Sequence, residues 1–283
     1  MILDIAKLSK STYFYKLEHK DYKHNKDKEI REKIMDIFKE NYCKYGLIRI
    51  TQELRNQGYL VNKKRVERIM KELNIRARPQ SKRYNSYKGE IGKICSNQLL
   101  VKQEIKHKIH IKRDFTTTRP YEKLGTDVTV FITDYGKLYL SPIIDFHTRE
   151  ILSYCISDSP NYAQVRTMLN NLFEKHGDKL SGAILHSDQG YQYQMKVYQQ
   201  TLIEHDIVQS MSRKGNCLDN SPTENFFGRL KEEMYYGREN TFESLNHLRK
   251  ELVKYIKYYN EKRIVNKLSI SPVMYRQQYY SSI

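Results

Sequence analysis

The stretch AILHSDQG, residues 183–190, decides the fold class of the second half of the chain. Its three leading apolar residues have the pattern of a short buried strand, and an acidic loop containing glycine follows. In α/β sheets, ligand sites lie at strand ends that open into such loops. The stretch therefore predicts an α/β domain and marks Asp188 as a candidate site residue.

The chain on both sides of this stretch alternates strand and helix patterns. Further strands are predicted over residues 126–133, 137–145, 150–156 and 207–210, the first two joined as a hairpin by the turn Asp134-Tyr135-Gly136. Helices are predicted over residues 162–176, 194–205, 222–235 and 243–259. This order predicts a mixed sheet with helices on its faces.

Two other acids have unusual positions. Asp127 lies in a run of Val, Thr and Phe, where β-propensity disfavours Asp and burial of its charge is costly. Glu224 lies at the start of a helix, just after Pro222. Taken singly, each acid has an ordinary explanation: Asp127 as an edge-strand acid, Asp188 as a turn residue, and Glu224 as a residue favoured by the helix dipole.

Taken together, the three acids meet a chemical demand. Phosphodiester cleavage and strand joining use two hard cations about 3.5–4 Å apart, and carboxylates are the ligands that such cations prefer. Asp127, Asp188 and Glu224 would supply them from a strand, a strand end and a helix. We therefore expect them to be both catalytic and metal-binding residues.

The charge of the chain indicates a polyanionic partner. Its 283 residues carry a net charge of +17, and residues 1–120 hold 30 Lys and Arg against 14 Asp and Glu. The remaining residues hold 20 against 19. The first 120 residues are therefore expected to make the main contact with nucleic acid.

The composition argues against a membrane or secreted protein. No stretch approaches the roughly 18 apolar residues of a membrane helix, and residues 1–10 carry Asp4 and Lys7 where a signal peptide would be apolar. Four widely spaced cysteines form no disulfide or zinc pattern. We expect a globular cytoplasmic protein, associated with the nucleoid when bound to DNA.

Three short helices are predicted near the N-terminus, from Asp27, over residues 50–56 and over residues 62–73. The outer face of the third helix carries Lys63, Lys64, Arg65 and Arg68. A basic third helix suggests a small all-α, helix-turn-helix-like DNA-binding module over residues 27–75. A solvated basic helix without DNA contact is the alternative.

The rest of the first half shows little apolar periodicity. Residues 1–26 have a weak pattern and form either an arm or a short helix. Residues 76–119 carry many Lys and Arg residues, and we interpret them as an extended basic linker that nucleic acid helps to order. Residues 120–283 would then form the catalytic core with its C-terminal helix and tail.

Several motifs resemble those of the insertion-sequence-three family of transposases. They are residues 126–129 (TDVT), 139–140 (YL), 144–145 (ID), 185–190 (LHSDQG), 210–217 (SMSRKGNC) and 219–220 (DN). Glu224 follows Asp188 after 35 intervening residues, the spacing of the DD(35)E triad that this family shares with retroviral integrases. Lys231 stands seven residues after Glu224, where the family has a basic residue against DNA.

The resemblance extends over nearly the whole chain from about residue 28. Residues 259–263 (YNEKR), Leu268 and residues 271–272 (SP) are similar to the closing elements of the family, and residues 45–66 are similar to its helix-turn-helix-like region. Two positions depart from the pattern. Leu124 replaces a customary tryptophan, and Arg49 alone remains of an arginine pair.

The resemblance implies a ribonuclease-H-like integrase core and a transposase that cleaves 3′ ends and transfers strands with two Mg²⁺ ions, for which Mn²⁺ would substitute. Asp127 and Asp188 would hold the ions and Glu224 would complete the site. Lys231, Arg213 and Lys214 would neutralise backbone phosphates. Asn216 and Asn220 would bind DNA or brace their loop, and His186 would either contact the scissile phosphate or orient its loop.

The resemblance also implies partners beyond DNA itself. Two element ends must be held together, so at least a homodimer is expected on DNA. Members of the family are often fused to an upstream-frame protein that binds the ends. A nuclease of the same fold that never joins strands, or an inactive DNA-binding remnant, are the competing hypotheses.

Overall fold

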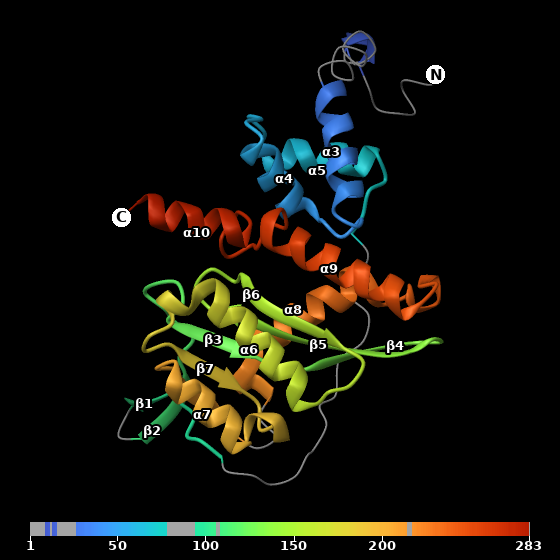
Figure 1. Cartoon of the computed structure of the whole chain (residues 1–283). Helices are drawn as coiled ribbons and strands as arrows, with labels where there is room; N and C mark the ends of the chain where they lie inside the picture. The colour runs from blue at the N-terminus through green and yellow to red at the C-terminus, as the bar shows by residue number, and fades with distance from the viewer. Residues whose placement is uncertain are drawn as a thin grey trace. The chain divides into compact units, whose positions relative to one another are not determined.

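The computed structural model of the chain describes residues 9–11, 13–15, 27–77, 94–105, 108–213 and 217–282 (Figure 1). The chain divides into two compact units, Met1–Pro79 and Gln80–Ile283, and we treat each by itself. The finer boundaries expected at residues 26, 75 and 119 stay a prediction. Within the described residues, no helix combines the length and apolar character needed to cross a membrane.

Within residues 27–77, the first unit forms three helices: α3 (Lys28–Glu40), α4 (Leu47–Asn56) and α5 (Lys63–Glu72). Each buries apolar residues at helical spacing, among them Ile34, Leu54 and Val66 with no exposed surface. The side chain of Asn62 accepts a hydrogen bond from the Lys64 N–H and so caps α5. The three predicted helices are thus confirmed.

The second unit is built on a six-stranded mixed sheet. Its strands are β3 (Lys123–Thr126), β4 (Thr129–Thr133), β5 (Gly136–Asp145), β6 (Ile151–Ser157), β7 (Ile184–Ser187) and β8 (Val208–Met211). The order is β4-β5-β3-β7-β8, with β6 paired to the other edge of β5. Strands β3, β7 and β8 are parallel, whereas β5 is antiparallel to β3, β4 and β6.

Helices cover the sheet on both faces (Figure 1). The α-helices are α6 (Tyr162–His176), α7 (Lys196–Glu204), α8 (Ser221–Leu230), α9 (Leu245–Glu261) and α10 (Pro272–Ser281), and a π-helical turn, η4 (Lys231–Tyr235), continues α8. Short 3₁₀ turns are η1 (Gly177–Lys179), η2 (Tyr191–Tyr193), η3 (Cys217–Asn220) and η5 (Glu239–Thr241). Helices α6 and α7 lie on one face and α8 on the other, so the predicted α/β architecture is confirmed.

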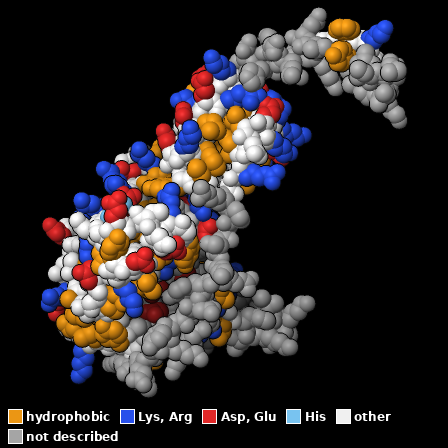
Figure 2. Space-filling view, turned by 90° about the vertical axis from the view of Figure 1, so that its right-hand side faces the viewer, with side chains coloured by type: hydrophobic (Ala, Val, Ile, Leu, Met, Phe, Trp, Pro, Cys, Tyr) orange, Lys and Arg blue, Asp and Glu red, His pale blue; other side chains and the backbone are white. Residues whose placement is uncertain are grey.

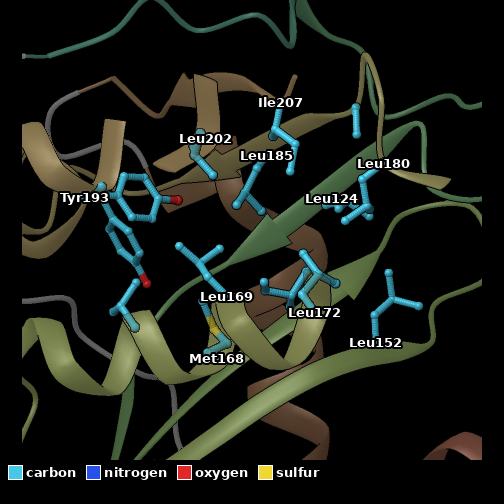
Figure 3. Packing of buried hydrophobic residues seen from close by; sticks show 14 of the residues in the cluster. Leu124, Leu152, Met168, Leu169, Leu172, Leu180, Leu185, Tyr193, Leu202 and Ile207 are labelled. Carbon is cyan, nitrogen blue, oxygen red and sulfur yellow. The ribbon is translucent and has the colours of Figure 1, made fainter. Parts of the chain in front are cut away.

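The main core lies between the sheet and the α6–α7 layer (Figure 3). Leu169 and Leu172 of α6 pack with Leu124 of β3 and Leu185 of β7, and none of these side chains has exposed surface. Burying each such side chain stabilises the fold by about 1.5–3 kcal/mol before entropy losses. This packing holds β3 and β7 side by side, which matters for the site below.

Part of the expected linker has regular structure. Strands β1 (Leu100–Ile105) and β2 (Lys108–Arg113) pair antiparallel, and the Asp114 N–H donates to the Leu99 carbonyl at 2.7 Å. Residues 100–105 and 108–113 of the predicted extended linker therefore form a paired two-stranded sheet. Strands β1 and β2 were not predicted because their many charged residues interrupt the alternation of apolar and polar residues by which strands are recognised.

Candidate active site

Asp127 lies in a gap between two strands. The sequence predicted one strand over residues 126–133, but β3 ends at Thr126 and β4 begins at Thr129. Both strands pair with β5 in one continuous register, and that register puts Pro142 opposite Asp127. Because proline has no N–H to donate, the ladder is weakened at this point. Asp127 is left with its Oδ1 accepting the Val128 N–H at 2.7 Å.

The parallel pairing of β3 with β7 brings the second acid beside the first. Leu124 pairs with Leu185 and Gly125 with His186, so the same register continued by two residues sets Asp127 beside Asp188. Neighbouring strands lie about 4.8 Å apart. The Asp188 Oδ1 accepts the Gly190 N–H at 2.9 Å, which holds the acidic loop compact. The two aspartates therefore meet at the carboxyl ends of adjacent parallel strands.

Glu224 comes from α8, which approaches β3 closely because Gly125 has no side chain. A Cβ at this position would lie 2.5 Å from Thr223 Oγ1 and would also collide with the Phe146 ring. The Asn220 Nδ2 donates to the Thr126 carbonyl at 3.1 Å and ties the start of α8 to the residue before Asp127. These contacts bring Glu224 toward the two aspartates.

The electrostatics of the three carboxyls show that they share one site. Burial, and then the charges of Asp188 and Glu224, raise the pKa of Asp127 well above its ordinary value. Burial raises the pKa of Asp188, and burial with the charge of Asp188 raises the pKa of Glu224. The charges of Asp188 and Glu224 thus make ionisation of Asp127 harder, and the charge of Asp188 does the same for Glu224.

The acid site lacks a matching set of cations. None of the three acids forms an ion pair with a Lys or Arg that the structure describes. In their present rotamers, no three His, Cys, Asp or Glu side chains within the described ranges converge on a single point as ligands of one ion. The site is therefore a cluster of buried acids without ion-pair partners among the described residues.

Lys231 is buried rather than exposed at the surface. Its side chain is 6% exposed, and its Nζ lies 5.4 Å from the centre of the Phe131 ring. Burial lowers the pKa of Lys231 to about 8, against the opposing effect of the Asp127 charge. Because α8 continues into η4, Lys231 is on the same side of the helix as Glu224, as the spacing predicted. Its contact with DNA stays a prediction.

Arg213 binds an acid of its own chain. Its guanidinium contacts both carboxylate oxygens of Asp219 at 3.0 Å, and its backbone N–H donates to the same carboxylate at 3.0 Å. The side chain is 40% exposed, so part of it faces solvent. Lys214 and Asn216 lie outside the described residues. Sequence reasoning missed Asp219 as an organising residue, although the motif Asp219-Asn220 had been noticed.

The basic face of α5 separates into two kinds of residue. Lys63 and Lys64 are exposed, whereas Arg65 and Arg68 bind the buried carboxylate of Asp27 at 2.8 and 2.5 Å. Figure 2 shows Lys and Arg side chains spread over this unit with hydrophobic side chains between them. The two lysines are the freer to meet a phosphate.

His186 belongs to the interior and lies beneath the acid loop. It is fully buried, and its Nδ1 and Nε2 lie 2.8 and 3.0 Å from the hydroxyls of Ser210 and Ser212. Burial lowers the pKa of His186 to about 4, so the ring is neutral. It joins β7 to the end of β8 and so fits the loop-orienting role. Asn220 likewise braces the backbone through Thr126.

Three family models match segments of this chain. A family described as Integrase core domain matches residues 117–217, and a second model of that description matches residues 224–280. A family described as HTH-like domain matches residues 24–83. The three acids thus fall in integrase core segments, and α3 to α5 in the HTH-like segment.

Whole-chain relatives decide the family. The chain is 42% identical, over 280 residues, to the putative transposase InsK for insertion sequence element IS150 of Escherichia coli strain K12, covering 99% of this chain and 93% of that protein. The chain belongs to the insertion-sequence-three family of transposases. Transposase InsF for insertion sequence IS3A of the same organism is 32% identical to this chain over 206 residues, which are 72% of this chain and 67% of the length of InsF.

A third relative supports the assignment. An uncharacterized transposase-like protein of Haemophilus influenzae is 48% identical to this transposase, over 77% of this chain and 94% of its own length. The expected fold is confirmed: a ribonuclease-H-like mixed sheet flanked by helices, with a helix-turn-helix-like module before it.

Proposed function

We propose that this transposase cleaves the 3′ ends of an insertion sequence and joins them to target DNA by two-metal phosphoryl transfer. The observation that carries the proposal is the meeting of Asp127, Asp188 and Glu224. Burial raises the pKa of all three acids, and acid neighbours further raise the pKa values of Asp127 and Glu224. Clusters of perturbed acids of this kind are typical of catalytic centres.

The donor set fits Mg²⁺, with Mn²⁺ as a substitute. All three donors are carboxylates, which hard cations prefer, and a bound cation would relieve their mutual repulsion. Asp127 and Asp188 would hold the ions, and Glu224 would complete the site from α8. Such ions, when bound, activate the attacking oxygen and stabilise the leaving oxygen of an in-line displacement.

The remaining residues of the site would set its geometry and charge. The Gly190 N–H fixes one oxygen of Asp188, and the Val128 N–H fixes one oxygen of Asp127. Lys231, buried beside Asp127, adds one positive charge and would reduce the repulsion between the carboxylates and an incoming phosphate. A water molecule or a 3′-hydroxyl of DNA would be the nucleophile.

DNA contact is proposed for the basic first part of the chain. The excess of Lys and Arg in residues 1–120 favours a phosphate backbone, and the exposed Lys63 and Lys64 are the leading candidates on α5. Arg65, Arg68, Arg213 and Lys214 remain further candidates. We propose that residues 27–75 act as the DNA-binding module, residues 76–119 as the connection, and residues 120–283 as the catalytic core.

Assembly is part of the same proposal. Joining requires two element ends to be held together, so the active form would be at least a dimer on DNA. An upstream-frame protein, or a fusion with one, would supply recognition of the end sequence.

The proposal is tested by a cleavage and joining assay on labelled element-end DNA with Mg²⁺ or Mn²⁺. Wild type is compared with Asp188→Asn and Glu224→Gln. We expect metal-dependent cleaved and joined products that both substitutions reduce by at least about a thousandfold. Cleaved products without joined products would favour a nuclease. Products that persist unchanged in both variants would rule out this site.

A further inference from the structure

A buried carboxylate just before α8 gathers three separate segments of the chain. Asp219 is 1% exposed, and its Oδ1 accepts from Arg113 Nε at 2.6 Å and from Arg213 Nη2 at 3.0 Å. Its Oδ2 accepts from Arg213 Nε and from the Arg213 backbone N–H, both at 3.0 Å, and from Asn97 Nδ2 at 3.1 Å. We name these four residues, Asn97, Arg113, Arg213 and Asp219, the Asp219 clamp.

Within the clamp, the negative charge of Asp219 is balanced by the guanidinium groups of Arg113 and Arg213. Burial acts to raise the pKa of Asp219, but hydrogen bonds from Arg213 and Arg113 outweigh it and hold the pKa well below the ordinary value. Bonds between a carboxylate and guanidinium groups are among the strong hydrogen bonds of proteins. The carboxylate is therefore fixed in place by five donors.

The position of the clamp connects it to the acid site. Asp219 lies in η3, the turn that leads into α8, and the next residue, Asn220, donates to the carbonyl of Thr126 beside Asp127. Glu224 follows one helical turn later. The clamp and the Asn220 contact thus hold the start of α8 from two sides.

We propose that Asp219 is a positioning residue of the transposase site: through Arg113 and Arg213, it fixes the start of α8 so that Glu224 faces Asp127 and Asp188. This inference rests on the proposed function of the three acids. It also assigns a role to the β1–β2 hairpin, because Arg113 closes β2 and Asn97 precedes β1. The hairpin is tied to the catalytic helix through a single carboxylate.

A matched control exists in the same unit. Glu150 is 6% exposed, and its Oε2 accepts from Arg276 Nε at 2.6 Å, so it too is a buried acid held by a guanidinium. Its partner Arg276 belongs to α10, and the hydrogen bonds of Glu150 within the described residues join it to Asp145, Thr148 and Arg276, none of which lies in α8. Glu150→Gln therefore removes the same charge from the same kind of pair without touching the clamp.

The test compares wild type, Asp219→Asn and Glu150→Gln by three measurements. Mn²⁺ affinity is measured by calorimetry, strand joining at saturating DNA by the assay above, and amide exchange of residues 220–226 by hydrogen–deuterium exchange. We expect Asp219→Asn to weaken Mn²⁺ binding and joining by about tenfold or more, as loss of a residue that orients metal ligands does. Glu150→Gln should leave both values within about twofold.

Arg113→Lys is the conservative variant. It keeps the positive charge while losing the guanidinium geometry, so its Mn²⁺ affinity should fall between those of wild type and Asp219→Asn. It also keeps the test open if Asp219→Asn does not fold. An Arg113→Lys protein with wild-type Mn²⁺ affinity and wild-type exchange would overturn the inference.

The remaining outcomes separate the inference from the proposed function. If wild type neither binds Mn²⁺ nor joins DNA, the proposed function fails, and amide exchange alone decides the clamp. Faster exchange over residues 220–226 in Asp219→Asn but not in Glu150→Gln would still support the clamp. Equal exchange in all proteins, or equal loss of Mn²⁺ binding in both acid variants, would overturn it.

Discussion

Two glutamates nine residues apart on one continuous helix have opposite environments. Glu233, in η4, accepts from Arg263 Nε and Nη2 at 2.7 and 2.6 Å and from the Tyr255 hydroxyl at 2.7 Å. Glu224, in α8, has an acid neighbour instead, and burial together with the charge of Asp188 raises its pKa. The helix thus carries one structural acid and one acid left available for chemistry.

The contrast extends to two other buried acids of the second unit. Asp219 and Glu150 are each bound by arginine. The three acids of the site are close to one another without such partners. Because burial of an unpaired charge costs free energy, this arrangement reduces stability, which agrees with the catalytic role proposed for the three acids.

The largest expected effect comes from breaking the structural pair. Arg263→Leu would leave Glu233 buried and without its guanidinium partner, which costs about 3–5 kcal/mol of unfolding free energy. Urea unfolding followed by circular dichroism measures the loss. The double variant Glu233→Gln with Arg263→Leu should recover a substantial part of it. A loss below about 1 kcal/mol in the single variant would show that the pair is not an organising contact.

The opposite sign is expected in the acid site. Asp188→Asn removes a buried charge that disfavours ionisation of Asp127 and Glu224, and it keeps the oxygen that accepts the Gly190 N–H, so the metal-free protein should be stabilised by about 1 kcal/mol. Thermal unfolding measures this, with the exposed Asp178→Asn as control. Mn²⁺ should raise the melting temperature of wild type and not of Asp188→Asn. A destabilised Asp188→Asn would show that the Asp188 charge does not reduce the stability of the metal-free protein.

A smaller, pH-dependent effect is expected at Asp114, a paired acid outside the site. Hydrogen bonds from the hydroxyl and N–H of Thr116, and then the ammonium of Lys123, lower the pKa of Asp114 from 3.8 to about 2. A lowered folded-state pKa contributes stability above pH 3.8 that is lost as the pH falls through 2. Because the side chain is 34% exposed, solvent screening limits this to about 0.5 kcal/mol.

Acid unfolding curves of wild type and Asp114→Asn test this contribution. The variant should be less stable at pH 7, and the two proteins should converge near pH 2. A stability difference that stays constant from pH 7 to pH 2 would mean that the carboxylate charge plays no part.

The smallest effect is expected at Tyr198, beneath the site. Tyr198 and Tyr193 are fully buried with ring centres 5.4 Å apart, and the Tyr198 hydroxyl has no hydrogen-bond partner among the described residues. Tyr198→Phe removes an unsatisfied polar atom, so stability should stay within about 0.5 kcal/mol of wild type or rise. Thermal unfolding measures it. A loss above about 1 kcal/mol would reveal a partner for that hydroxyl.

Local patterns predicted most of the fold. The helices α3 to α9 and the strands β4 to β8 follow from apolar spacing and turn residues, with ends displaced by a few residues. The acids were recognisable because Asp127 contradicts its strand surroundings and Asp188 follows a buried strand. Helix α10 was missed, although Ser271 and Pro272 are typical of a helix start.

Long-range pairings were beyond the reach of the sequence. Asp219 pairs with Arg113, which lies 106 residues earlier, and nothing local distinguishes these charges from solvated ones. Lys231, in η4, is buried with its Nζ over the aromatic ring of Phe131 in β4. Charged residues in such pairs look like DNA contacts in a basic sequence until the fold shows their partners.

Under the proposed function, Asp127, Asp188 and Glu224 hold the divalent ions on which strand transfer depends. Its most direct test is the joining rate of pre-cleaved element ends as a function of Mn²⁺ concentration for wild type, Asp188→Asn and Glu150→Gln. We expect saturable, Mn²⁺-dependent joining by wild type and Glu150→Gln and no joining by Asp188→Asn. Joining by Asp188→Asn at the wild-type rate, or joining by wild type with all divalent ions chelated, would contradict it.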